Sequence, residues 1–249
     1  MAAAGMNIQS IWRYPVKSLL GEPLNEALIE DRGLSGDRAY AVADASGKLG
    51  SGKSTSHFQR IDNLLFLRAE TQNNEVHIGL PGETLEPISS RDLPNRLSDY
   101  LEQPVILVED QDAAHFDDGA VHIILSSDLN RLQAQFSHLD FDPRRFRANL
   151  LLNTPDHMSA EDMLGRIFTI GDVRLKITHP TERCVMVTAK QDGLSPEPLI
   201  LKAISQGYDV NFGLYASVLK PGRIEVGQDV EVSAEVGGRD RSGRQEFGF

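Results

Sequence analysis

The sequence predicts a mainly β protein, a β-barrel or curled sheet with a few helices. Most apolar segments are short, bounded by turn residues and rich in Val and Ile, which favours strands over helices. Few segments have the apolar spacing of a crossover helix, so a doubly wound parallel sheet is disfavoured. At roughly 150 residues per domain, the chain of 249 residues allows one large or two small domains.

The expected strands are the short apolar runs themselves. In chain order they are Ile8–Tyr14, Ala39–Val42, Leu64–Leu67, Val76–Leu80, Val105–Val108, Val121–Leu125, Asn149–Leu152, Val173–Ile177, Cys184–Thr188, Phe212–Leu219 and Arg223–Val226. Each is bounded by residues that favour turns, as expected for strands joined by tight connections.

Three segments are expected to be helical instead. Asp92 is suited to cap a helix over Leu93–Glu102, and Ser126 or Ser127 to begin a helix that continues through Phe136. A third, shorter helix is expected over 198–205. The inward-facing residues are Leu93, Leu97, Tyr100 and Leu101 in the first helix, and Leu129, Leu132 and Phe136 in the second.

An acidic stretch near the middle of the chain is the candidate domain boundary. Residues 109–119 carry five Asp or Glu and a Gly without helical apolar periodicity, as expected for a solvated linker. We therefore expect a first domain over residues 1–112 and a second over residues 113–236. Residues 237–249 are polar and Gly-rich, which predicts a flexible tail.

Charge and hydropathy narrow the class of protein. With 25 Lys and Arg against 36 Asp and Glu, the formal charge is −11, which argues against an extended nucleic-acid surface. No run approaches the roughly 18 apolar residues that a membrane span needs. The N-terminus lacks the basic and then apolar regions of a secretory signal. We expect a soluble, cytoplasmic protein that binds neither nucleic acid nor membrane.

The chain has one cysteine, Cys184, which excludes a disulfide, a Cys-rich zinc site and a Cys-ligated iron–sulfur cluster within the chain. A lone cysteine is commonly a small buried hydrophobe. The neighbouring Arg183 would favour the thiolate, which binds soft metals or attacks electrophiles, although adjacent residues on a strand point to opposite faces. His179 could act as a base toward the thiol. The residues alone leave packing and chemistry both open.

Residues 47–54, Gly-Lys-Leu-Gly-Ser-Gly-Lys-Ser, match the phosphate-binding P-loop pattern. In that interpretation Lys53 neutralises phosphate and Ser54 holds magnesium. However, Asp44–Lys48 is a turn sequence typical of a hairpin, and a P-loop requires a parallel sheet with crossover helices. A Gly-rich hairpin loop is therefore the favoured prediction, and a nucleotide-binding protein is the remote alternative.

Basic and hydroxyl residues recur at the ends of the expected strands. The clusters are Lys17-Ser18, Asp37-Arg38, Lys53-Ser54, Ser126-Ser127 and the segment Arg144–Asn149. In a protein of net charge −11, such clusters suit an anionic ligand that bears phosphate. Surface charges paired with nearby Asp and Glu are the alternative for each cluster. The seven histidines show no metal-binding spacing.

In their order and spacing, these segments resemble the MOSC superfamily, named for the C-terminal domain of molybdenum cofactor sulfurase. The first half is similar to its N-terminal β-barrel domain and the second half to the MOSC domain, which implies a two-lobed architecture. The motifs of the first half are Tyr14–Ser18, Gly33-Leu34, Gly36–Arg38 and Phe58–Arg60. Those of the second half are Arg145–Asn149, Ala160–Asp162, Ile170–Val173, Arg183-Cys184 and Pro221–Val230.

Within this superfamily, the chain resembles the amidoxime-reducing component proteins and their bacterial counterparts, in which the molybdenum cofactor lies between the two domains. The resemblance implies Cys184 as the metal ligand and Asp172 as an acidic residue near the metal. Asp172 would orient substrate or relay protons, or else satisfy backbone N–H groups at a turn. The implied contacts to the pterin and its phosphate are Lys17, Ser18, Arg38, Lys53, Ser126, Arg147, Asn149 and Arg183.

The implied activity is reduction of N-hydroxylated small molecules, such as hydroxylated nucleobases or amidoximes, at molybdenum. Electrons would come from a separate protein, ferredoxin-like or a flavoprotein, because this chain lacks the cysteines for an iron–sulfur cluster. The alternative is a non-redox carrier of sulfur or of the cofactor, in which Cys184 holds persulfide. Pyridoxal phosphate is not expected. Glu182 departs from the small polar residue that reductase-type relatives often carry at that position.

Overall fold

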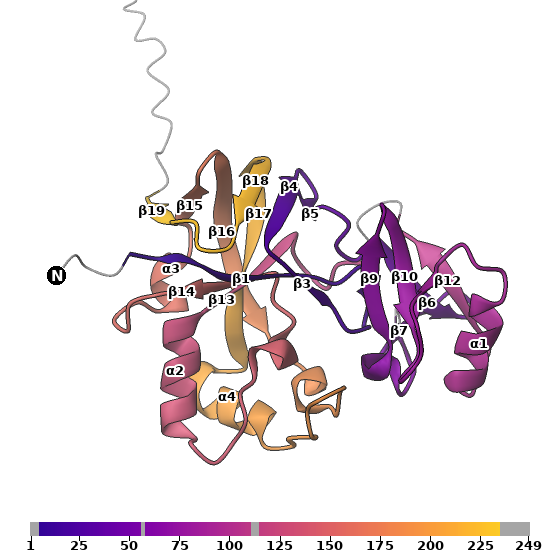
Figure 1. Cartoon of the computed structure of the whole chain (residues 1–249). Coiled ribbons are helices and arrows are strands. Elements are labelled where there is room, and N and C mark those ends of the chain that lie inside the picture. The colour runs from indigo at the N-terminus through magenta and orange to yellow at the C-terminus, as the bar shows by residue number, and fades with distance from the viewer. Residues whose placement is uncertain (1–4, 56–57, 111–114, 235–249) are drawn as a thin grey trace, which may run out of the picture.

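The computed structural model describes residues 5–55, 58–110 and 115–234, which form two lobes built mainly from strands (Figure 1). The larger lobe is based on a curled sheet with the strand order β19-β15-β16-β17-β13-β14-β1-β3. Its strands are β1 (Asn7–Arg13), β3 (Glu22–Leu24), β13 (Val121–Leu125), β14 (Leu150–Asn153), β15 (Ile167–Ile170), β16 (Val173–Glu182), β17 (Asn211–Lys220) and β19 (Glu231–Ser233). The predicted mainly β fold class is confirmed. The predicted tail lies outside the described residues.

The larger lobe takes strands from both halves of the chain. β1 lies antiparallel to β14, with Ile11 opposite Leu150, and β13 runs parallel to β14. A small sheet joins β4 (Glu26–Glu30) to β5 (Gly33–Leu34) on one side and to β18 (Gly222–Glu225) on the other. The chain thus begins in the larger lobe, builds the smaller lobe and then returns (Figure 1).

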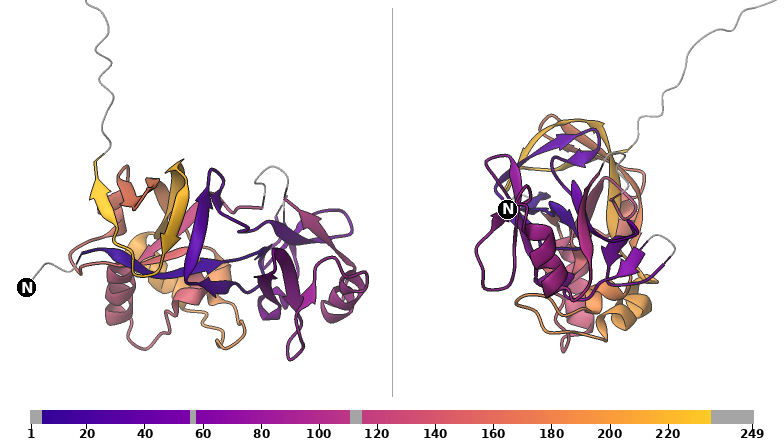
Figure 2. Two further views of the ribbon diagram at one scale, coloured as in Figure 1. Left: turned by 45° about the horizontal axis from the view of Figure 1, so that its top comes forward. Right: turned by 90° about the vertical axis from the view of Figure 1, so that its right-hand side faces the viewer.

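The smaller lobe holds two sheets. One has the order β12-β6-β7-β8, with β2 paired to β6, and the other has the order β11-β10-β9. The strands are β2 (Val16–Lys17), β6 (Tyr40–Asp44), β7 (Leu49–Ser51), β8 (Phe58–Arg60), β9 (Arg68–Gln72), β10 (Glu75–Gly79), β11 (Glu86–Pro87) and β12 (Val105–Glu109). Figure 2 shows this lobe at one end of the larger one, so residues from both lobes meet at the junction.

Each lobe has its own apolar core. Inward-facing residues of the large sheet pack together, among them Ile8, Ile123, Leu150, Phe168 and Leu214. In the smaller lobe the packed residues include Val16, Val42, Leu67, Ile78 and Leu97. A third cluster, on the helical side of the large sheet, includes Leu132, Phe146, Ile204 and Phe212. Burial of these side chains fixes the two lobes, while many of the residues at their junction are polar.

The three expected helices are present, with ends shifted by a few residues. They are α1 (Leu93–Tyr100), α2 (Ser126–Gln135) and α4 (Ile200–Tyr208). A further short helix, α3 (Ala160–Met163), begins after Ser159, whose hydroxyl accepts the backbone N–H of Asp162. Within the described ranges, no helix combines the length and the apolar character needed to cross a membrane.

Two of the expected strands are wrong. The segments Leu64–Leu67 and Cys184–Thr188 contain the 3-10 helical turns η1 (Leu64–Phe66) and η3 (Val185–Thr188); another such turn is η2 (Pro143–Phe146). Apolar runs this short have too few positions for periodicity to separate a strand from a helical turn. In η1, for example, the adjacent residues Leu64 and Leu65 are both buried, whereas a strand with one buried face would alternate.

The Gly-rich segment at residues 47–54 is part of a hairpin, as its turn sequence predicts. β6 and β7 pair antiparallel. In the turn between them, the Asp44 carboxylate accepts the backbone N–H groups of Ser46 and Lys48 at 2.8 and 3.0 Å. The next described segment after Thr55 is the strand β8, not the helix that follows the Lys-Ser pair of a P-loop. The hairpin is therefore confirmed, and the nucleotide-binding alternative loses its structural context.

Candidate functional site

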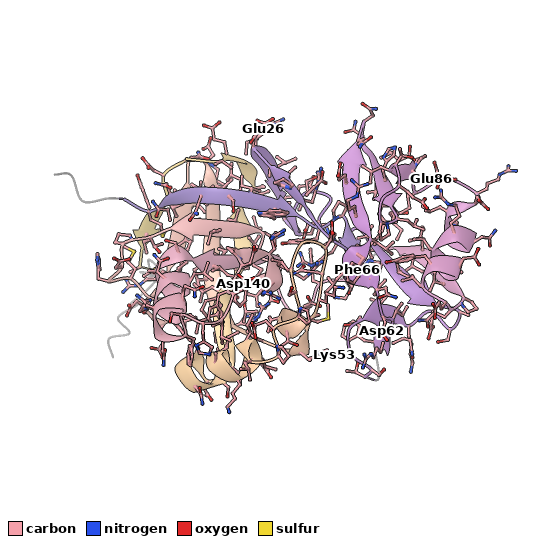
Figure 3. The ribbon with its side chains drawn as sticks, turned by 60° about the horizontal axis from the view of Figure 1, so that its bottom comes forward. Glu26, Lys53, Asp62, Phe66, Glu86 and Asp140 are labelled. Atoms are coloured by element: carbon pink, nitrogen blue, oxygen red, sulfur yellow. The ribbon has the colours of Figure 1, made fainter. Side chains whose placement is uncertain are left out.

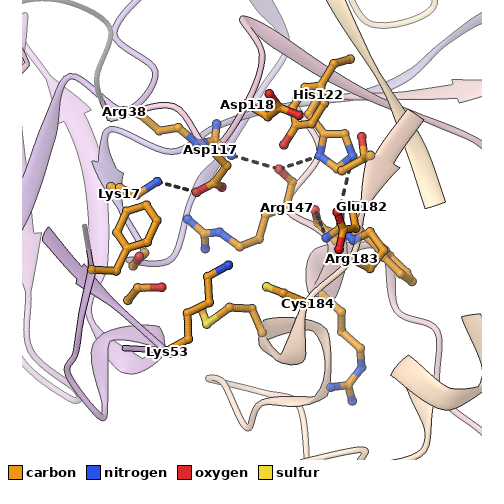
Figure 4. A pocket seen from close by; sticks show the side chains of 18 residues that line it. Lys17, Arg38, Lys53, Asp117, Asp118, His122, Arg147, Glu182, Arg183 and Cys184 are labelled. Atoms are coloured by element: carbon orange, nitrogen blue, oxygen red, sulfur yellow. Dashed lines mark hydrogen bonds and ion pairs between the residues drawn. The ribbon is translucent and has the colours of Figure 1, made fainter. Parts of the chain in front are cut away.

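A cavity of about 290 Å³ lies at the junction of the two lobes, and most of its lining side chains are polar or charged (Figure 4). One side is lined by Lys17, Ser18, Arg38, Ser51, Lys53 and Phe58. The other side is lined by Asp117, Asp118, His122, Arg145, Phe146, Arg147, Thr181, Glu182, Arg183, Cys184, Met186 and Tyr215. The structure therefore brings together the predicted site residues Lys17, Ser18, Arg38, Lys53, Arg147, Arg183 and Cys184.

Lys17 ends the short strand β2, and its side chain is almost completely buried. Its ammonium group donates to the backbone oxygen of His115 at 2.8 Å and to the carboxylate of Asp117 at 2.5 Å. It also lies 5.1 Å from the centre of the Phe58 ring. Desolvation lowers the pKa of Lys17, although the charge of Asp117 opposes the shift. Lys17 is thus a buried cation with a carboxylate partner.

Arg38 is a second buried cation with a carboxylate partner. Its Nη1 donates to Asp37, whose buried carboxylate also accepts the backbone N–H of Tyr14 at 2.8 Å. Burial disfavours the charged guanidinium, but the charges of Asp37 and Asp117 outweigh burial and raise the pKa of Arg38. Nη2 of Arg38 donates to the backbone oxygen of Arg147 at 3.4 Å. Arg38 therefore links the two sides of the cavity.

Arg147 has no carboxylate partner among the described residues. Its Nη1 donates to the backbone oxygen of Leu19 at 2.7 Å, and its guanidinium lies 4.3 Å from the centre of the Tyr14 ring. Its Nη2 is buried without a hydrogen-bond partner. Desolvation lowers the pKa of Arg147 to about 10, which leaves it charged at neutral pH. A buried guanidinium that keeps its charge and an unused donor fits an anionic ligand.

Arg183 is the other lining guanidinium that, within the described ranges, lacks a carboxylate partner. Nη2 donates to the backbone oxygen of Phe146 at 2.9 Å, Nη1 donates to Nε2 of His122 at 3.3 Å, and Nε is buried without a partner. Desolvation lowers the pKa of Arg183 and also lowers that of His122 well below its usual value. The hydroxyl of Thr181, likewise buried without a partner, is a further unused donor at the cavity.

Three lining residues have the left-handed backbone conformation that non-glycine residues rarely adopt. The angle φ is 65° at Ser18, 50° at Arg38 and 55° at Arg147. Such conformations cost about 1–3 kcal/mol each and persist where surrounding contacts enforce them. At Ser18 one such contact is the hydrogen bond from its hydroxyl to the backbone oxygen of Gly50, at 2.9 Å. Three of the nine non-glycine residues with positive φ in the described ranges therefore line the cavity, and strained backbone is common at ligand sites.

Cys184 lies half-buried between the end of β16 and the start of η3. The pairing of β16 with β17 shifts register just before Glu182, which marks a bulge. Because a bulge redirects side chains, residues 181–184 all line the cavity rather than alternating between two faces. The backbone N–H of Arg183 donates to the backbone oxygen of Val210 at 2.8 Å and holds this bend. Arg183 and Cys184 thus face the same space although they are adjacent.

Carboxylates lie on the exposed side of the cavity. Asp118 and Glu182 are both exposed, and Asp118 pairs with Nε2 of His179 at 2.9 Å. The ring of His179 packs against that of Tyr215, with 5.2 Å between the ring centres. His179 therefore contacts Asp118, and its position does not support the prediction that it acts as a base toward Cys184.

The acidic stretch contains ion pairs that its composition does not predict, although Glu109, Asp117 and Asp118 are exposed. The carboxylate of Asp110 is buried and pairs with Arg32 at 2.7 Å, and Asp117 pairs with Lys17. Burial alone would raise the pKa of Asp117, but the charges of Lys17 and Arg38 outweigh it and hold this pKa below its usual range. The sequence shows the acidic residues of the stretch, but not that the fold places Arg32 and Lys17 beside them. Residues 111–114 of the stretch lie outside the described ranges.

Lys53 reaches the cavity from the hairpin loop and is exposed at the junction of the lobes (Figure 3). Figure 4 shows its ammonium group pointing into the same space as the side chains of Arg147 and Cys184. The loop packs closely on Met186, because a Cβ added at Gly52 would lie 2.1 Å from the Met186 sulfur. Glycine at position 52 therefore allows the hairpin loop to close against η3 beside Cys184.

Asp172 does not line the cavity, and its predicted place near a metal is corrected. It lies in the turn between β15 and β16, at the opposite end of the ten-residue strand β16 from Cys184. At about 3.3 Å per residue, that strand separates the two residues by roughly 30 Å. Asp172 is exposed and pairs with Lys220 at 2.7 Å. Asp172 thus lies in a turn, as the alternative expected, although the partner that the structure gives its carboxylate is Lys220 and not a backbone N–H group.

Ser126 and Asn149 also lie outside the cavity lining, because backbone groups engage their side chains. The hydroxyl of Ser126 accepts the backbone N–H of Thr154 at 2.9 Å at the start of α2. Asn149 is fully buried; its side chain accepts the backbone N–H of His122 at 3.0 Å and donates to the backbone oxygen of Trp12 at 3.2 Å. Sequence shows a polar residue but not which buried backbone group it satisfies.

The cavity fits an anionic cofactor that contains a soft metal. Two buried guanidinium groups and a buried hydroxyl present unused donors, and the only cysteine of the chain lies beside them. A cysteine thiolate suits soft metals. In the described part of the chain, no group of three His, Cys, Asp or Glu side chains is arranged to hold a metal ion. A metal at Cys184 would therefore share its coordination with the organic part of the cofactor.

Comparison with known proteins defines the class. The family model of the MOSC N-terminal beta barrel domain matches residues 5–122, and that of the MOSC domain matches residues 110–231. The chain belongs to the MOSC family. It is 22% identical over 245 residues to a molybdenum cofactor sulfurase of Drosophila erecta and 23% identical over 239 residues to that of Drosophila melanogaster. These matches cover 84% and 81% of this chain but only 31% and 30% of the relatives, so it spans about a third of their length.

Two solved structures share parts of the fold at low similarity. The YuaD protein of Bacillus subtilis matches with a TM-score of 0.47 and 10% identity, over 92% of this chain and 96% of that one. YiiM of Geobacillus stearothermophilus matches with a TM-score of 0.39 and 24% identity, over 49% of this chain and 58% of that one.

Sequence analysis missed several lining residues. They are Asp117, Asp118, His122, Thr181 and Tyr215. The two aspartates were hidden in a stretch that composition assigns to a linker. Thr181 lies three residues before Cys184, and only a bend at the end of the strand could have indicated that it shares the cavity. His122 and Tyr215 are single polar residues within apolar strands, where no spacing pattern separates a lining residue from a core residue.

Proposed function

We propose that this protein binds the molybdenum cofactor in the cavity and reduces N-hydroxylated compounds with electrons from a separate donor protein. The single observation that supports binding best is the pair Arg147 and Arg183 beside Cys184, two guanidinium groups that each have one buried donor without a partner. Buried charge without a partner is costly, so the arrangement indicates an anion that completes it. Membership of the MOSC family supports molybdenum cofactor as that ligand.

Different residues of the cavity would hold different parts of the cofactor. Cys184 would bind the metal through its thiolate, which the positive charge of Arg183 favours. Arg147 and Arg183 would bind the phosphate through their unused donors, since guanidinium groups form charge-assisted hydrogen bonds to phosphate oxygens, and Lys17 and Arg38 would add positive charge around it. Lys53 is exposed and would contact the cofactor from the exposed side of the cavity.

When bound, the molybdenum cofactor supplies the redox centre at which oxygen is removed from nitrogen. Reduction of an N-hydroxyl group to N–H consumes two electrons and two protons and releases water. The chain must therefore deliver protons to the exposed side of the cavity. With Asp172 at the far end of β16, the carboxylates in position are Asp118, which pairs with His179, and Glu182.

A carrier of sulfur or of the cofactor, without redox turnover, is the second candidate function. Cys184 is half-buried and not fully enclosed, so its thiol remains open to a reaction partner. The matched relatives are named molybdenum cofactor sulfurases. In this function Cys184 would carry a persulfide, which is a reversible modification of a thiolate.

Molybdenum and pterin content of the purified protein test the proposal. The protein is expressed in a host that makes molybdenum cofactor, and molybdenum and pterin are quantified per chain. We expect both in the wild type, loss of molybdenum in Cys184→Ala, and no change in Asp62→Asn. Asp62 is an exposed carboxylate outside the cavity that pairs with Arg60, so this variant controls for a change of charge alone.

Activity separates the two candidate functions. A wild type that holds cofactor should reduce an amidoxime or an N-hydroxylated nucleobase when a chemically reduced dye donates the electrons. Cofactor without such reduction, together with a persulfide on Cys184, would favour the carrier. Absence of molybdenum and pterin from the wild type would exclude both the reductase and a resident cofactor.

A further inference from the structure

His122 lines the cavity and accepts a hydrogen bond from the guanidinium of Arg183 (Figure 4). Nε2 of His122 and Nη1 of Arg183 are 3.3 Å apart, and the other ring nitrogen, Nδ1, lies 3.4 Å from the backbone oxygen of Arg147. One imidazole therefore contacts both segments that contribute unpaired guanidinium groups to the cavity. Neither the sequence motifs nor the proposed function gives His122 a role.

The ring of His122 is fixed from several directions. Its backbone N–H donates to the side chain of Asn149 at 3.0 Å, and its backbone oxygen accepts the N–H of Asn149 at 2.8 Å. The ring packs against Tyr215, with 5.3 Å between the ring centres. On the other side, Gly213 has φ 99°, and a Cβ there would lie 2.6 Å from Nε2. These contacts together hold the ring of His122 in one orientation.

The contacts also determine which nitrogen carries the proton. Arg183 can only donate, so Nε2 of His122 must accept and cannot carry a proton. The proton of the neutral ring is then on Nδ1, where it can be donated to the backbone oxygen of Arg147. Full burial, which holds the pKa of His122 well below its usual value, agrees with the neutral form. His122 is therefore a neutral acceptor between two cationic segments.

We propose that His122 is a positioning residue: it holds the guanidinium of Arg183 in one orientation, so that this lining side chain can bind an anion in the cavity. With Nη1 on His122 and Nη2 on the backbone oxygen of Phe146, two of the three guanidinium nitrogens are fixed. The planar, rigid guanidinium then has one orientation for its remaining donor, Nε. The inference rests on the proposed anion-binding role of Arg183.

This role also explains the buried position of Asn149. Its side chain contacts the backbone of His122 and not the cavity. Asn149 therefore affects the ligand site indirectly, because it fixes the strand segment that carries His122. A histidine that only packs in the core would fill the same volume. The hydrogen bond that Nε2 accepts from Arg183 is what distinguishes a positioning role of His122 from packing alone.

Three substitutions separate the acceptor from the packing. Gln places an amide oxygen near the position of Nε2, Asn places its amide near Nδ1, and Leu fills volume without a polar group. The assay is calorimetric titration of cofactor-free protein with inorganic phosphate, and thermal unfolding verifies that each variant is folded. We expect His122→Gln to bind phosphate within about threefold of the wild type. His122→Leu and His122→Asn should bind about tenfold more weakly, because Nη1 of Arg183 loses its acceptor.

Two controls show whether the effect passes through Arg183. His138→Leu changes an exposed histidine outside the cavity and should leave phosphate binding unchanged. In an Arg183→Lys background, which keeps the charge but loses the guanidinium geometry, His122→Leu should alter phosphate affinity less than about twofold. Such loss of effect would demonstrate coupling between the two residues.

Equal affinity of the His122→Leu variant and the wild type would overturn the inference, as would equal losses in the folded Leu and Gln variants. Failure of the wild type to bind phosphate would overturn it too, because Arg183 would then bind no anion. The proposed function is judged independently, by the molybdenum and pterin content of the protein. Retention of cofactor by a protein that fails the phosphate assay would leave that function intact.

Discussion

Four of the cations that line the cavity fall into two pairs that differ in their partners. Lys17 and Arg38 each form an ion pair with a carboxylate of the chain, Asp117 and Asp37. Arg147 and Arg183, on the side that also carries Cys184, contact only neutral groups among the described residues. We refer to Lys17 and Arg38 as the paired cations and to Arg147 and Arg183 as the unpaired cations.

The difference shows which part of the site is complete without a ligand. The paired cations are neutralised within the fold, so their burial needs no further charge. The unpaired cations keep buried donors without partners, which the proposed ligand would supply. The unpaired side is also the side with the metal-binding candidate Cys184. The two pairs should therefore respond in opposite ways to loss of charge.

The largest effect is expected for Arg38→Met. This substitution leaves the carboxylate of Asp37 buried, with the backbone N–H of Tyr14 as its remaining close donor. Removing one member of a buried ion pair typically costs about 3–5 kcal/mol. Urea unfolding of the cofactor-free protein should show this loss in the free energy of unfolding. A loss below about 1 kcal/mol would contradict the classification of Arg38 as a paired cation.

For Arg147→Met we expect no loss in the free energy of unfolding, in contrast to Arg38→Met. Desolvation lowers the pKa of Arg147 to about 10, so the folded chain bears a cost for keeping this charge buried. The free energy of unfolding of the cofactor-free variant should be unchanged or higher by about 1 kcal/mol. Phosphate affinity should nevertheless fall, by about tenfold or more. A variant that is strongly destabilised would show that Arg147 has a structural partner.

The contrast between the pairs also shows what sequence can predict. Strands made of short apolar runs, such as β10 and β13, were located to within about two residues, and all three amphipathic helices were found. The resemblance predicts Lys17, Ser18, Arg38 and Arg147 alike as ligand contacts. The distinction of Lys17 and Arg38 from Arg147 was not visible, because the ion pairs that separate the two classes depend on which carboxylates the fold brings close.

Two differences from the predictions lie at opposite ends of β16 and have different causes. Cys184–Thr188 was predicted to be a strand, and Asp172 was predicted to lie at the site. Local sequence does not encode the register shift that bends the end of β16 into the cavity, since that bulge depends on pairing with β17. The length of β16 places Asp172 far from Cys184, although the two residues are only twelve positions apart.

Acid should weaken the fold through His122, the acceptor of an unpaired cation. Its pKa is well below the usual 6.5, mainly because of burial and also because of Arg183 and Arg38. As pH falls below 6.5, the unfolded chain binds a proton that the folded chain does not. The free energy of unfolding then decreases, by at most about 1.4 kcal/mol per pH unit from this residue. The buried residue His115 adds a change of the same sign.

Comparison of urea unfolding between about pH 7.5 and about pH 5.5 isolates this contribution. The wild type should lose more stability over this interval than His122→Gln, which cannot titrate. The Gln variant retains His115, so the difference between the two proteins belongs to His122. Parallel losses in both proteins would mean that His122 is protonated in the folded state or does not affect the transition.

A smaller effect is expected when a paired cation is converted into an unpaired one. In Asp117→Asn, the ammonium group of Lys17 loses its carboxylate and becomes available to an added anion. Inorganic phosphate should then bind about fivefold more tightly, because it no longer competes with the internal carboxylate. Calorimetric titration measures this change, with Asp62→Asn as the control for net charge. Weaker binding by Asp117→Asn would mean that Asp117 orients Lys17 toward the ligand.

The smallest effect is expected at Asp172, which lies outside both pairs. Its carboxylate is exposed and pairs with the exposed Lys220 at the far end of β16. Such surface pairs contribute little to stability, and no cavity residue contacts Asp172 in the described part of the chain. Asp172→Asn should therefore leave the melting midpoint and the molybdenum content unchanged. Loss of molybdenum in this variant would mean that the metal lies nearer to the turn between β15 and β16 than to Cys184, and the contrast between paired and unpaired cations would then describe a different site.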